Sequence, residues 1–214
     1  MKRVFLAVAC ILALTGCAHN PDDPAAHRHA DPHQTRTAEE WARFLENPAR
    51  DEWQQPQAVI AAMQIRPVEA IADIGAGSGY FSRRLAVPAR KVYAVDLDPK
   101  LLEMIRQSGP ANIETVLGAP DDPRLPTASV DTIFICDVLH HIRDRPAYYA
   151  KLRRALRPGG RIIIIDFYKR PLPVGPPVAA KLHEDDVARE LLAAGFLLSQ
   201  KRTFLPHQYY LEFR

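Results

Sequence analysis

Cysteine is scarce in this sequence of 214 residues, which contains 3: Cys10, Cys17 and Cys136. Cys10 and Cys17 lie in the apolar opening segment, so a protein that lost or modified that segment would keep only Cys136 as a free thiol. No internal disulfide could then form. Excess charge of either sign is also lacking, because 28 Lys and Arg face 25 Asp and Glu, a formal net charge of +3. This balance does not indicate a nucleic-acid-binding protein.

A hydrophobic run long enough to span a membrane is missing at the start of the chain. The apolar run at residues 4–14 is shorter than the roughly 20 residues that a helix needs to cross a hydrocarbon core of about 30 Å. Lys2 and Arg3 precede this run, and small residues follow it. Such an arrangement is typical of a secretory signal peptide.

The quartet "LTGC" at residues 14–17 resembles the lipobox of bacterial lipoproteins, in which cleavage precedes a cysteine that is then diacylated. We therefore expect residues 1–16 to be removed and Cys17 to carry the lipid anchor, with a soluble secreted protein as the alternative. Loss of Lys2 and Arg3 leaves a net charge of +1. Ala18 stands where an Asp would favour retention in the inner membrane, so the expected location is the periplasm-facing cell envelope, with the outer membrane favoured.

Residues 17–37 are rich in Pro, Asp and His and have almost no apolar bulk. This composition predicts a disordered tether between the anchor and a folded domain. His27, His29 and His33 lie in the tether. Because nothing there fixes their geometry, we interpret them as solvated residues rather than as a metal site, and we predict no metal site elsewhere.

From residue 38 to residue 214 the pattern is that of one folded domain. Nearly continuous apolar runs, typical of strands buried on both faces of a parallel sheet, occur at residues 68–74, 91–97, 112–117, 130–136 and 161–167. Helical segments alternate with them. Helices are predicted to begin near Thr37, after Pro56 and at Asp98, and another to open at Asp144 and close at Gly159-Gly160. We expect a turn between the first two helices, and two C-terminal strands that turn at residues 206–207. The sequence predicts a doubly wound α/β domain.

The turn after the first strand carries the most informative motif, "ADIGAGSGYF" at residues 72–81. Gly75, Gly77 and Gly79 allow a ligand to approach the backbone. Asp96 ends the second strand 21 residues after Gly75, where an acidic residue can accept hydrogen bonds from both hydroxyls of a ribose. Tyr80 occupies the last glycine position of the dinucleotide fingerprint GxGxxG, which disfavours a nicotinamide-dependent reductase. Asp73 suits a ligand with an α-amino group, as in S-adenosylmethionine.

Four stretches together carry a family resemblance: "DIGAGSGYF", "VYAVDLDPKLL", "VLGAPDDPRLPTASVDTIFICDVLHHI" and "LRRALRPGGRIIIIDF". They resemble the motifs of class I S-adenosylmethionine-dependent methyltransferases of the small-molecule type, which includes the ubiquinone-biosynthesis methyltransferases. The resemblance implies a mostly parallel, seven-stranded, Rossmann-like sheet with an antiparallel C-terminal edge strand.

The same resemblance implies a set of cofactor-binding residues. They are Asp73, Gly75, Ala76, Gly77, Gly79 and Tyr80 at the methionine end, Asp96 at the ribose, Leu97 near the adenine, Asp121 or Asp122 at the adenine amino group, and Asp137 facing the methyl group. The segment "GAPDD" interrupts a Gly-Asp pair that is common in the family. Asp121 and Asp122 could therefore equally lie in a solvated turn.

Asp137, His140 and His141 are the candidate catalytic residues. A histidine can act as a general base near neutral pH, although histidines at this position can also support the cofactor loop. Methyl transfer is a direct displacement that positioning alone accelerates strongly, so it does not require a base. Trp53 and Gln54 could close over the cofactor, with core packing of Trp53 as the alternative, and Tyr168 could contact the acceptor or pack.

The sequence thus predicts a membrane-tethered methyltransferase that transfers a methyl group from S-adenosylmethionine to an unidentified small molecule. The alternative is a non-catalytic lipoprotein that keeps the fold as a binding or scaffold module. The oligomeric state is left open between monomer and homodimer.

Overall fold

The computed structural model describes residues 37–214. The predicted signal peptide at residues 1–16, the lipidation site Cys17 and the tether up to residue 36 lie outside the described residues and stay predictions. Within residues 37–214, every helix is too short or too polar to span a bilayer.

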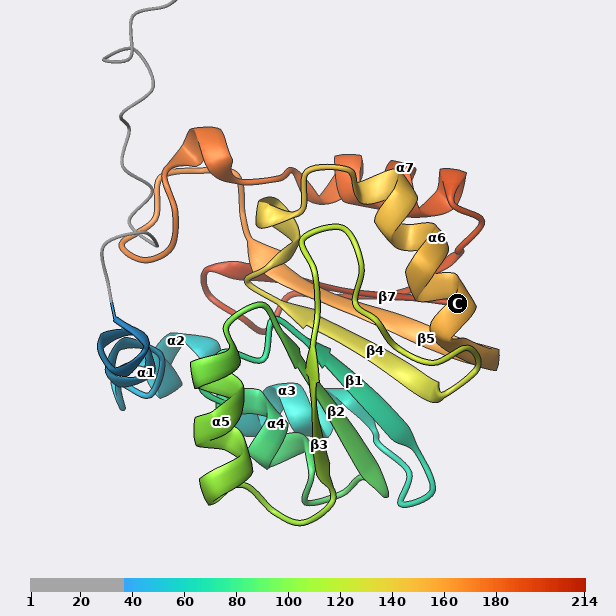
Figure 1. Cartoon of the computed structure of the whole chain (residues 1–214). Coiled ribbons are helices and arrows are strands. Elements are labelled where there is room, and N and C mark those ends of the chain that lie inside the picture. The colour runs from blue at the N-terminus through green and yellow to red at the C-terminus, as the bar shows by residue number, and fades with distance from the viewer. Residues whose placement is uncertain (1–36) are drawn as a thin grey trace, which may run out of the picture. The chain divides into compact units, whose positions relative to one another are not determined.

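One seven-stranded sheet forms the centre of the domain (Figure 1). Its strands are β1 (Ala70–Ile74), β2 (Lys91–Asp96), β3 (Ile113–Leu117), β4 (Val130–Cys136), β5 (Leu156–Phe167), β6 (Leu198–Arg202) and β7 (Gln208–Phe213). They lie in the order β3-β2-β1-β4-β5-β7-β6. Strands β1 to β5 pair in parallel, whereas β7 is antiparallel to both β5 and β6. The predicted fold class is confirmed.

Four of the seven helices in residues 37–214 begin where a side chain caps the first turn. The helices are α1 (Ala38–Leu45), α2 (Arg50–Gln54), α3 (Pro56–Met63), α4 (Tyr80–Leu85), α5 (Pro99–Ser108), α6 (Arg145–Ala155) and α7 (Glu184–Ala193), with short 3₁₀ turns η2 (Leu139–His141) and η3 (Val178–Ala180). Thr37 and Glu40 form a reciprocal capping box at α1. Asp98 accepts a hydrogen bond from the Lys100 amide at the start of α5 (2.8 Å).

Two predicted boundaries are wrong. The helix that opens at Asp144 does not extend to Gly159-Gly160, because α6 ends at Ala155 and β5 already begins at Leu156. Leu156 pairs with Val130 of β4, so this segment belongs to the sheet and does not extend the helix. The expected turn between the first two helices contains α2, a helix of 5 residues. The side chains of α2 contact residues that are far away in the sequence, and local sequence patterns do not reveal such contacts.

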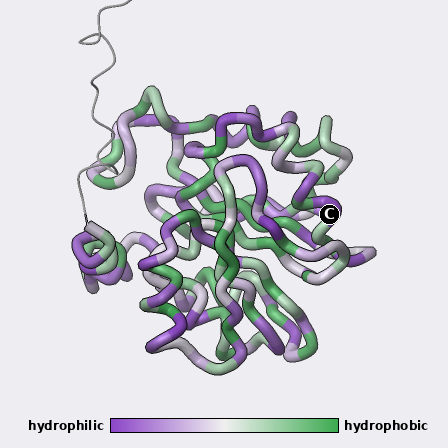
Figure 2. The backbone as a smooth tube through the Cα atoms, viewed as in Figure 1, coloured by the Kyte–Doolittle hydropathy of each residue, from purple (hydrophilic) through white to green (hydrophobic). Residues whose placement is uncertain are grey.

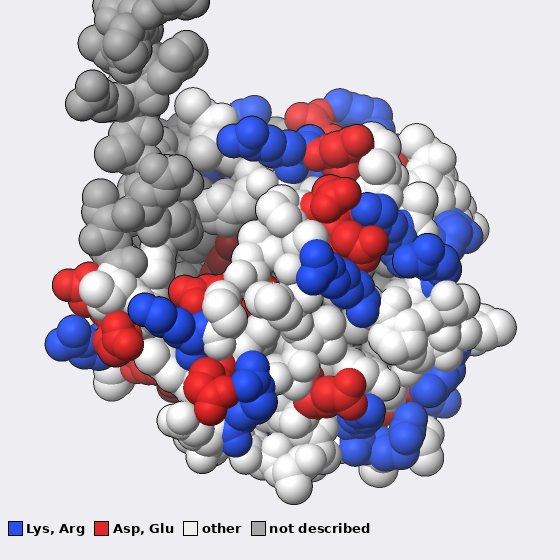
Figure 3. All heavy atoms as spheres, viewed as in Figure 1, with Lys and Arg blue, Asp and Glu red and all other residues white. Residues whose placement is uncertain are grey.

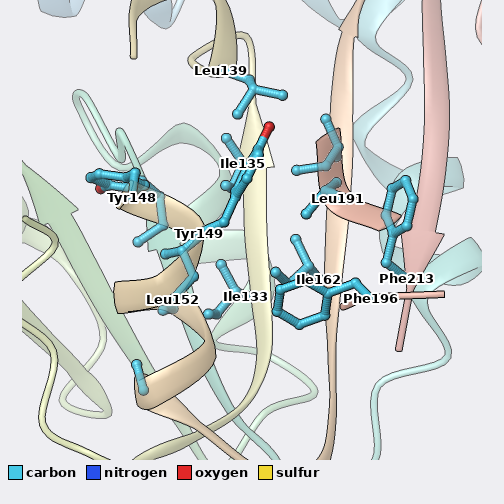
Figure 4. Close-up of a cluster of buried hydrophobic side chains, with 14 of the residues drawn as sticks. Ile133, Ile135, Leu139, Tyr148, Tyr149, Leu152, Ile162, Leu191, Phe196 and Phe213 are labelled. Carbon is cyan, nitrogen blue, oxygen red and sulfur yellow. The ribbon is translucent and has the colours of Figure 1, made fainter. Parts of the chain in front are cut away.

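Each face of the sheet packs against its own helices. Ile133, Ile162 and the aromatic rings of Tyr149 and Phe213 belong to the cluster on the α6 and α7 side, which also contains Leu191 (Figure 4). On the opposite side, alternate strand residues such as Ile163 pack with α3 and α4, and α5 covers Ala94 of β2. In Figure 2 the hydrophobic segments accordingly follow the strands. Because the strands are covered on both faces, ligand access is left at the carboxyl ends of the parallel strands.

Candidate functional site at the carboxyl ends of the strands

The glycine turn follows β1 directly, as the sequence predicts. Gly75, Gly77 and Gly79 all have positive φ angles (+74°, +55° and +89°), which strain residues with side chains. A Cβ atom added to Gly77 would lie 2.7 Å from Cδ1 of Leu45. The amides of Gly75 and Ala76 donate to the carbonyl of Val95 at 2.8 and 2.9 Å. The turn is therefore fixed against β2 on one side and approached closely by the end of α1 on another.

Asp73 lies inside the sheet, one residue before the end of β1. Its carboxylate accepts a hydrogen bond from Oγ of Ser82 at 2.6 Å. Burial, with a smaller contribution from the nearby Asp96, raises the pKa of Asp73 to about 6, although Ser82 and the positive charge of Arg50 oppose the rise. An ionised Asp73 is therefore costly unless a cation comes near it.

Asp96 ends β2 beside this turn. One of its oxygens accepts from the Gly77 amide at 2.7 Å and the other from the Asp98 amide at 2.9 Å. Burial raises its pKa, against these backbone hydrogen bonds. Each carboxylate oxygen has a further lone pair. Asp96 can thus still accept two hydroxyl hydrogen bonds while it holds the glycine turn.

Asp137 follows β4 and has a positive φ of 61°, a conformation that non-glycine residues adopt rarely and that clusters at functional sites. Arg50 of α2 contacts it, with Nη2 of the guanidinium 3.5 Å from Oδ2 of the carboxylate. Gln208 of β7 donates a hydrogen bond to the other oxygen. Burial raises the pKa of Asp137 to about 7 in spite of Arg50. This carboxyl group titrates near neutral pH.

Helix α2 covers this group of carboxylates. Arg50 also lies over the ring of Tyr80, with its guanidinium carbon 4.1 Å from the ring centroid. Gln54 is buried and donates to Oε1 of Gln208 at 2.7 Å, and Trp53 lies against the ring of Phe167 at 5.7 Å between centroids. Trp53 and Gln54, which were predicted to lie near the cofactor, are therefore at this edge of the sheet, where both pack against other side chains of the protein.

The three residues expected at the adenine lie further along the same edge. Leu97 is 55% exposed directly after β2, which leaves an apolar surface for a flat ring. Asp121 bonds to Nζ of Lys151 on α6 (3.2 Å), and Asp122 accepts from the Arg124 amide at 2.7 Å. Both carboxylates thus have protein partners in a turn, and their contact with adenine stays a prediction.

His140 and His141 occupy η2, just after Asp137. Nδ1 of His140 lies 2.9 Å and 3.0 Å from the two oxygens of Asp166, near the end of β5. The two histidine rings lie against each other at 4.1 Å between centroids. Tyr168 packs against Tyr209 at 6.0 Å. The structure brings His140 close to the site on a buried acid that the sequence reading did not single out.

Arg50, Asp166 and Gln208 are the site residues that sequence reasoning missed. Asp166 ends the run "IIIID", the same apolar-run-then-acid signal that identified Asp73 and Asp96, and could have been found by it. Arg50 lies in a polar segment and Gln208 begins the buried strand β7, and no local pattern marks either residue.

Three carboxyl groups with raised pKa values lie around the glycine turn: that of Asp73 is buried, and those of Asp96 and Asp137 are partly buried. A ligand with positive charge would favour their ionised forms, and Asp96 is free to bind a diol. S-adenosylmethionine has an amino group, a sulfonium and a ribose, so the residues present fit it. Lys, Arg, Asp and Glu are interspersed on the face shown in Figure 3, without one broad basic patch.

Comparisons with known proteins agree with this geometry. A family profile described as "Methyltransferase domain" matches residues 72–164, the stretch from β1 into β5. This part of the chain is therefore similar to a methyltransferase domain. The solved S-adenosylmethionine-dependent methyltransferase from Aquifex aeolicus superposes with a TM-score of 0.76 at 22% identity, covering 83% of this chain and 98% of that one. The predicted fold is confirmed, and the similarities support the predicted methyltransferase class and the predicted cofactor.

Curated relatives of the methyltransferase domain match over part of their length. Malonyl-[acyl-carrier protein] O-methyltransferase of Serratia marcescens is 39% identical over 97 residues, which are 45% of this chain and 38% of the relative. The ubiquinone/menaquinone biosynthesis C-methyltransferase of Caulobacter vibrioides is 30% identical over 134 residues, 57% of this chain and 52% of the relative. The chain thus spans about half of these relatives or less, and the narrower resemblance to ubiquinone-biosynthesis enzymes stays a prediction.

Proposed function

We propose that the protein transfers a methyl group from S-adenosylmethionine to a small-molecule acceptor. This proposal rests on one observation. The glycine turn is surrounded by three carboxyl groups, those of Asp73, Asp96 and Asp137. When bound, S-adenosylmethionine supplies an electrophilic methyl carbon on a positively charged sulfur. Residues of this chain would bind and position the two reactants.

Each carboxylate has its own role in the proposed complex. Asp73, together with the turn from Gly75 to Gly79, would hold the methionine end. Asp96 would accept hydrogen bonds from the ribose hydroxyls while it keeps the Gly77 amide in place. Asp137, fixed by Arg50 and Gln208, would face the reacting methyl group. Because methyl transfer is a displacement in line, positioning of the two reactants accounts for much of the rate.

We place the acceptor beside the tips of β4 and β5. Phe167 and Tyr168 lie at the end of β5, and Trp53 of α2 reaches Phe167 from the N-terminal side. Phe167 itself is buried, and the partly exposed rings of Trp53 and Tyr168 offer an apolar surface of the kind that lines small-molecule sites. The acceptor itself stays unidentified.

Label transfer tests the proposed activity. The purified protein would be incubated with methyl-labelled S-adenosylmethionine and small-molecule extract of the cell envelope, and labelled products would be separated and identified. We expect label in a small molecule with wild-type protein and none with Asp73→Asn, which keeps the size of the side chain. Cofactor binding without any labelled product would instead support the non-catalytic binding module.

We also propose that Cys17 anchors the protein to the cell envelope through lipid. The support is the sequence of residues 1–17, with its basic start, apolar run and "LTGC" quartet. Two or more acyl chains on one residue give stable membrane attachment. Cys17→Ala is expected to move the protein from the membrane fraction to the soluble fraction, while Cys10→Ala leaves it in the membrane. Unchanged fractionation of Cys17→Ala would refute the anchor.

A further inference from the structure

Lys181 is a buried lysine in the loop that joins β5 to α7, directly after η3. Only 2% of its surface is exposed. Its Nζ donates a hydrogen bond to the carbonyl of Arg170 at 2.9 Å, and it forms no ion pair with any of residues 37–214. An ammonium group has three N–H donors. Two of them are therefore without an acceptor in the described part of the chain.

This position is costly for a charged side chain. Burial lowers the pKa of Lys181, while the charge of Asp166 opposes the change. Asp166 is bonded to His140 instead, with its two oxygens 2.9 Å and 3.0 Å from Nδ1 of the imidazole. The carbonyl of Arg170 does not require a positive charge, because a neutral donor would serve it equally well. A buried ammonium is stabilised by an anion in contact with it, so Lys181 is suited to an anionic ligand.

The loop around Lys181 carries charge of one sign. Residues 168–182 contain Lys169, Arg170 and Lys181 and not one Asp or Glu. In the whole chain, by contrast, 28 Lys and Arg face 25 Asp and Glu. The loop leaves the carboxyl end of β5 (Figure 1), the edge of the sheet that holds the candidate site. Acidic groups thus surround the glycine turn, whereas the loop beyond β5 is basic and attracts anions.

Packing and proline fix this loop against the end of β5. Gly175 has a φ of +87°, and a Cβ atom added to it would lie 2.6 Å from Cδ1 of Phe167. Four of residues 171–177 are proline, whose φ angle is restricted by the ring. Nζ of Lys181 lies 5.9 Å from the centroid of the Phe167 ring, and the Trp53 ring lies 5.7 Å from the same centroid. Lys181 is therefore held beside the aromatic residues at which we place the acceptor.

We propose that Lys181 binds an anionic group of the acceptor, a carboxylate or a phosphate, and that the protein methylates acidic small molecules. The inference rests on the proposed methyltransferase function and names the class of substrate for the same site. The cationic cofactor would face the carboxyl groups around the glycine turn, and the anion of the acceptor would face Lys181 beyond β5. Charge would thus orient the two reactants and select against neutral analogues of the acceptor.

The first test uses the wild-type, full-length protein and small-molecule extract of the cell envelope. The extract is separated by anion exchange at neutral pH, and each fraction is incubated with methyl-labelled S-adenosylmethionine. We expect label in a product of the fraction that binds the exchanger. Mass spectrometry of that product distinguishes the two sources of charge, since either a phosphate or a carboxyl group, free or methylated, supports the proposal. Label from the unbound fraction only, or a product with neither group, would overturn it.

The second test compares the steady-state kinetics of variants on dilutions of the active fraction. Lys181→Gln keeps a donor for the Arg170 carbonyl but removes the charge, so the apparent KM for the acceptor should rise about tenfold or more. Its kcat and its affinity for S-adenosylmethionine should stay close to those of the wild type. Lys181→Arg keeps the charge and should keep most of the acceptor affinity. Lys169→Gln removes an exposed charge from the same loop and should leave KM unchanged.

The outcomes separate this inference from the function on which it rests. If Lys181→Gln lowers the melting temperature but leaves KM unchanged, Lys181 only holds the loop and the inference is wrong. An equal rise of KM in Lys169→Gln would also overturn it, because the effect would then come from the charge of the loop as a whole. In both cases the wild type would still transfer label. Failure of every fraction to accept label would instead reject the methyltransferase proposal.

Discussion

Arg50 contacts Asp137 across the top of the sheet, with Nη2 of the guanidinium 3.5 Å from Oδ2 of the carboxylate. The two residues are far apart in the sequence, one in α2 and the other after β4. Their side chains are only 12% and 18% exposed. This ion pair ties the N-terminal helices to the strand end at which we place the methyl transfer, and it provides the first prediction.

Arg50→Gln should destabilise the protein more at about pH 8 than at about pH 6. The charge of Arg50 opposes the rise in the pKa of Asp137, so its loss leaves a buried carboxylate without a cation at the higher pH. Removing one partner of a buried pair costs about 3 to 5 kcal/mol when the other stays charged. Thermal unfolding at the two pH values measures the difference.

Arg84→Gln is the matched control for Arg50. Arg84 also lies over the ring of Tyr80, at 4.0 Å, but its ion-pair partner is Asp51. It should show little dependence on pH over this range. An equal loss of stability at both pH values in Arg50→Gln would contradict the assigned role of the Arg50–Asp137 pair.

The ligand-free protein should gain stability from Asp73 and Asp137 as pH falls from about 8 to about 5. Their folded pKa values are about 6 and about 7, above the value of roughly 3.9 for an unfolded Asp. The folded state therefore binds protons more tightly, and this contribution is lost as pH rises through 6 to 7. Urea unfolding across this range should show it. Asp137→Asn should be more stable than wild type at about pH 8, and lower stability there would contradict the assignment.

Affinity for S-adenosylmethionine should change with pH in the opposite sense. A cationic ligand favours the ionised carboxylates, so binding is expected to tighten as pH rises through the region of 6 to 7. Calorimetric titration at several pH values measures this. Asp137→Asn should weaken the change of S-adenosylmethionine affinity with pH in the upper part of this pH range. Affinity that falls as pH rises would show that these carboxyl groups do not face the positive charge.

Tyr209→Phe should leave the protein as stable as wild type or make it more stable. The Tyr209 hydroxyl is buried and has no hydrogen-bond partner among residues 37–214, a state that costs about 1 to 3 kcal/mol. Tyr149→Phe is the control, because the Tyr149 hydroxyl bonds to Oε2 of Glu190 at 3.2 Å and its removal should lower stability by about 1 kcal/mol. A melting temperature that falls more in Tyr209→Phe than in Tyr149→Phe would show that the Tyr209 hydroxyl has an unrecognised partner.

Most of the sheet was predictable because its strands are continuous apolar runs, separated by residues that favour turns or cap helices. Residues 130–136 form β4 as expected, and β2 ends at Asp96, one residue before the predicted end of its apolar run. Asp98 and Thr37 cap α5 and α1 through local contacts. These features depend only on neighbours in the chain. The early start of β5 was missed because Leu156 pairs with β4 in spite of the nearby Gly159-Gly160, which reads locally as a helix stop.

The site was predictable to the extent that its residues follow strands. Asp73, Asp96 and Asp137 each come at or near the end of an apolar run, and the topology brings those ends to one edge. Arg50 and Gln208 were not predictable, since their roles depend on contacts between segments 87 and 71 residues from Asp137. The roles of the cofactor residues themselves stay predictions.

The most direct test of the central claim is calorimetric titration of the protein with S-adenosylmethionine, alongside S-adenosylhomocysteine and NADH. The account predicts that both sulfur ligands bind and that NADH does not. It also predicts that Asp96→Ala weakens binding of S-adenosylmethionine by about tenfold or more, because charge-assisted hydrogen bonds contribute about 1.5 to 3 kcal/mol. Absence of binding by either sulfur ligand, or equal affinity in Asp96→Ala, would contradict the account.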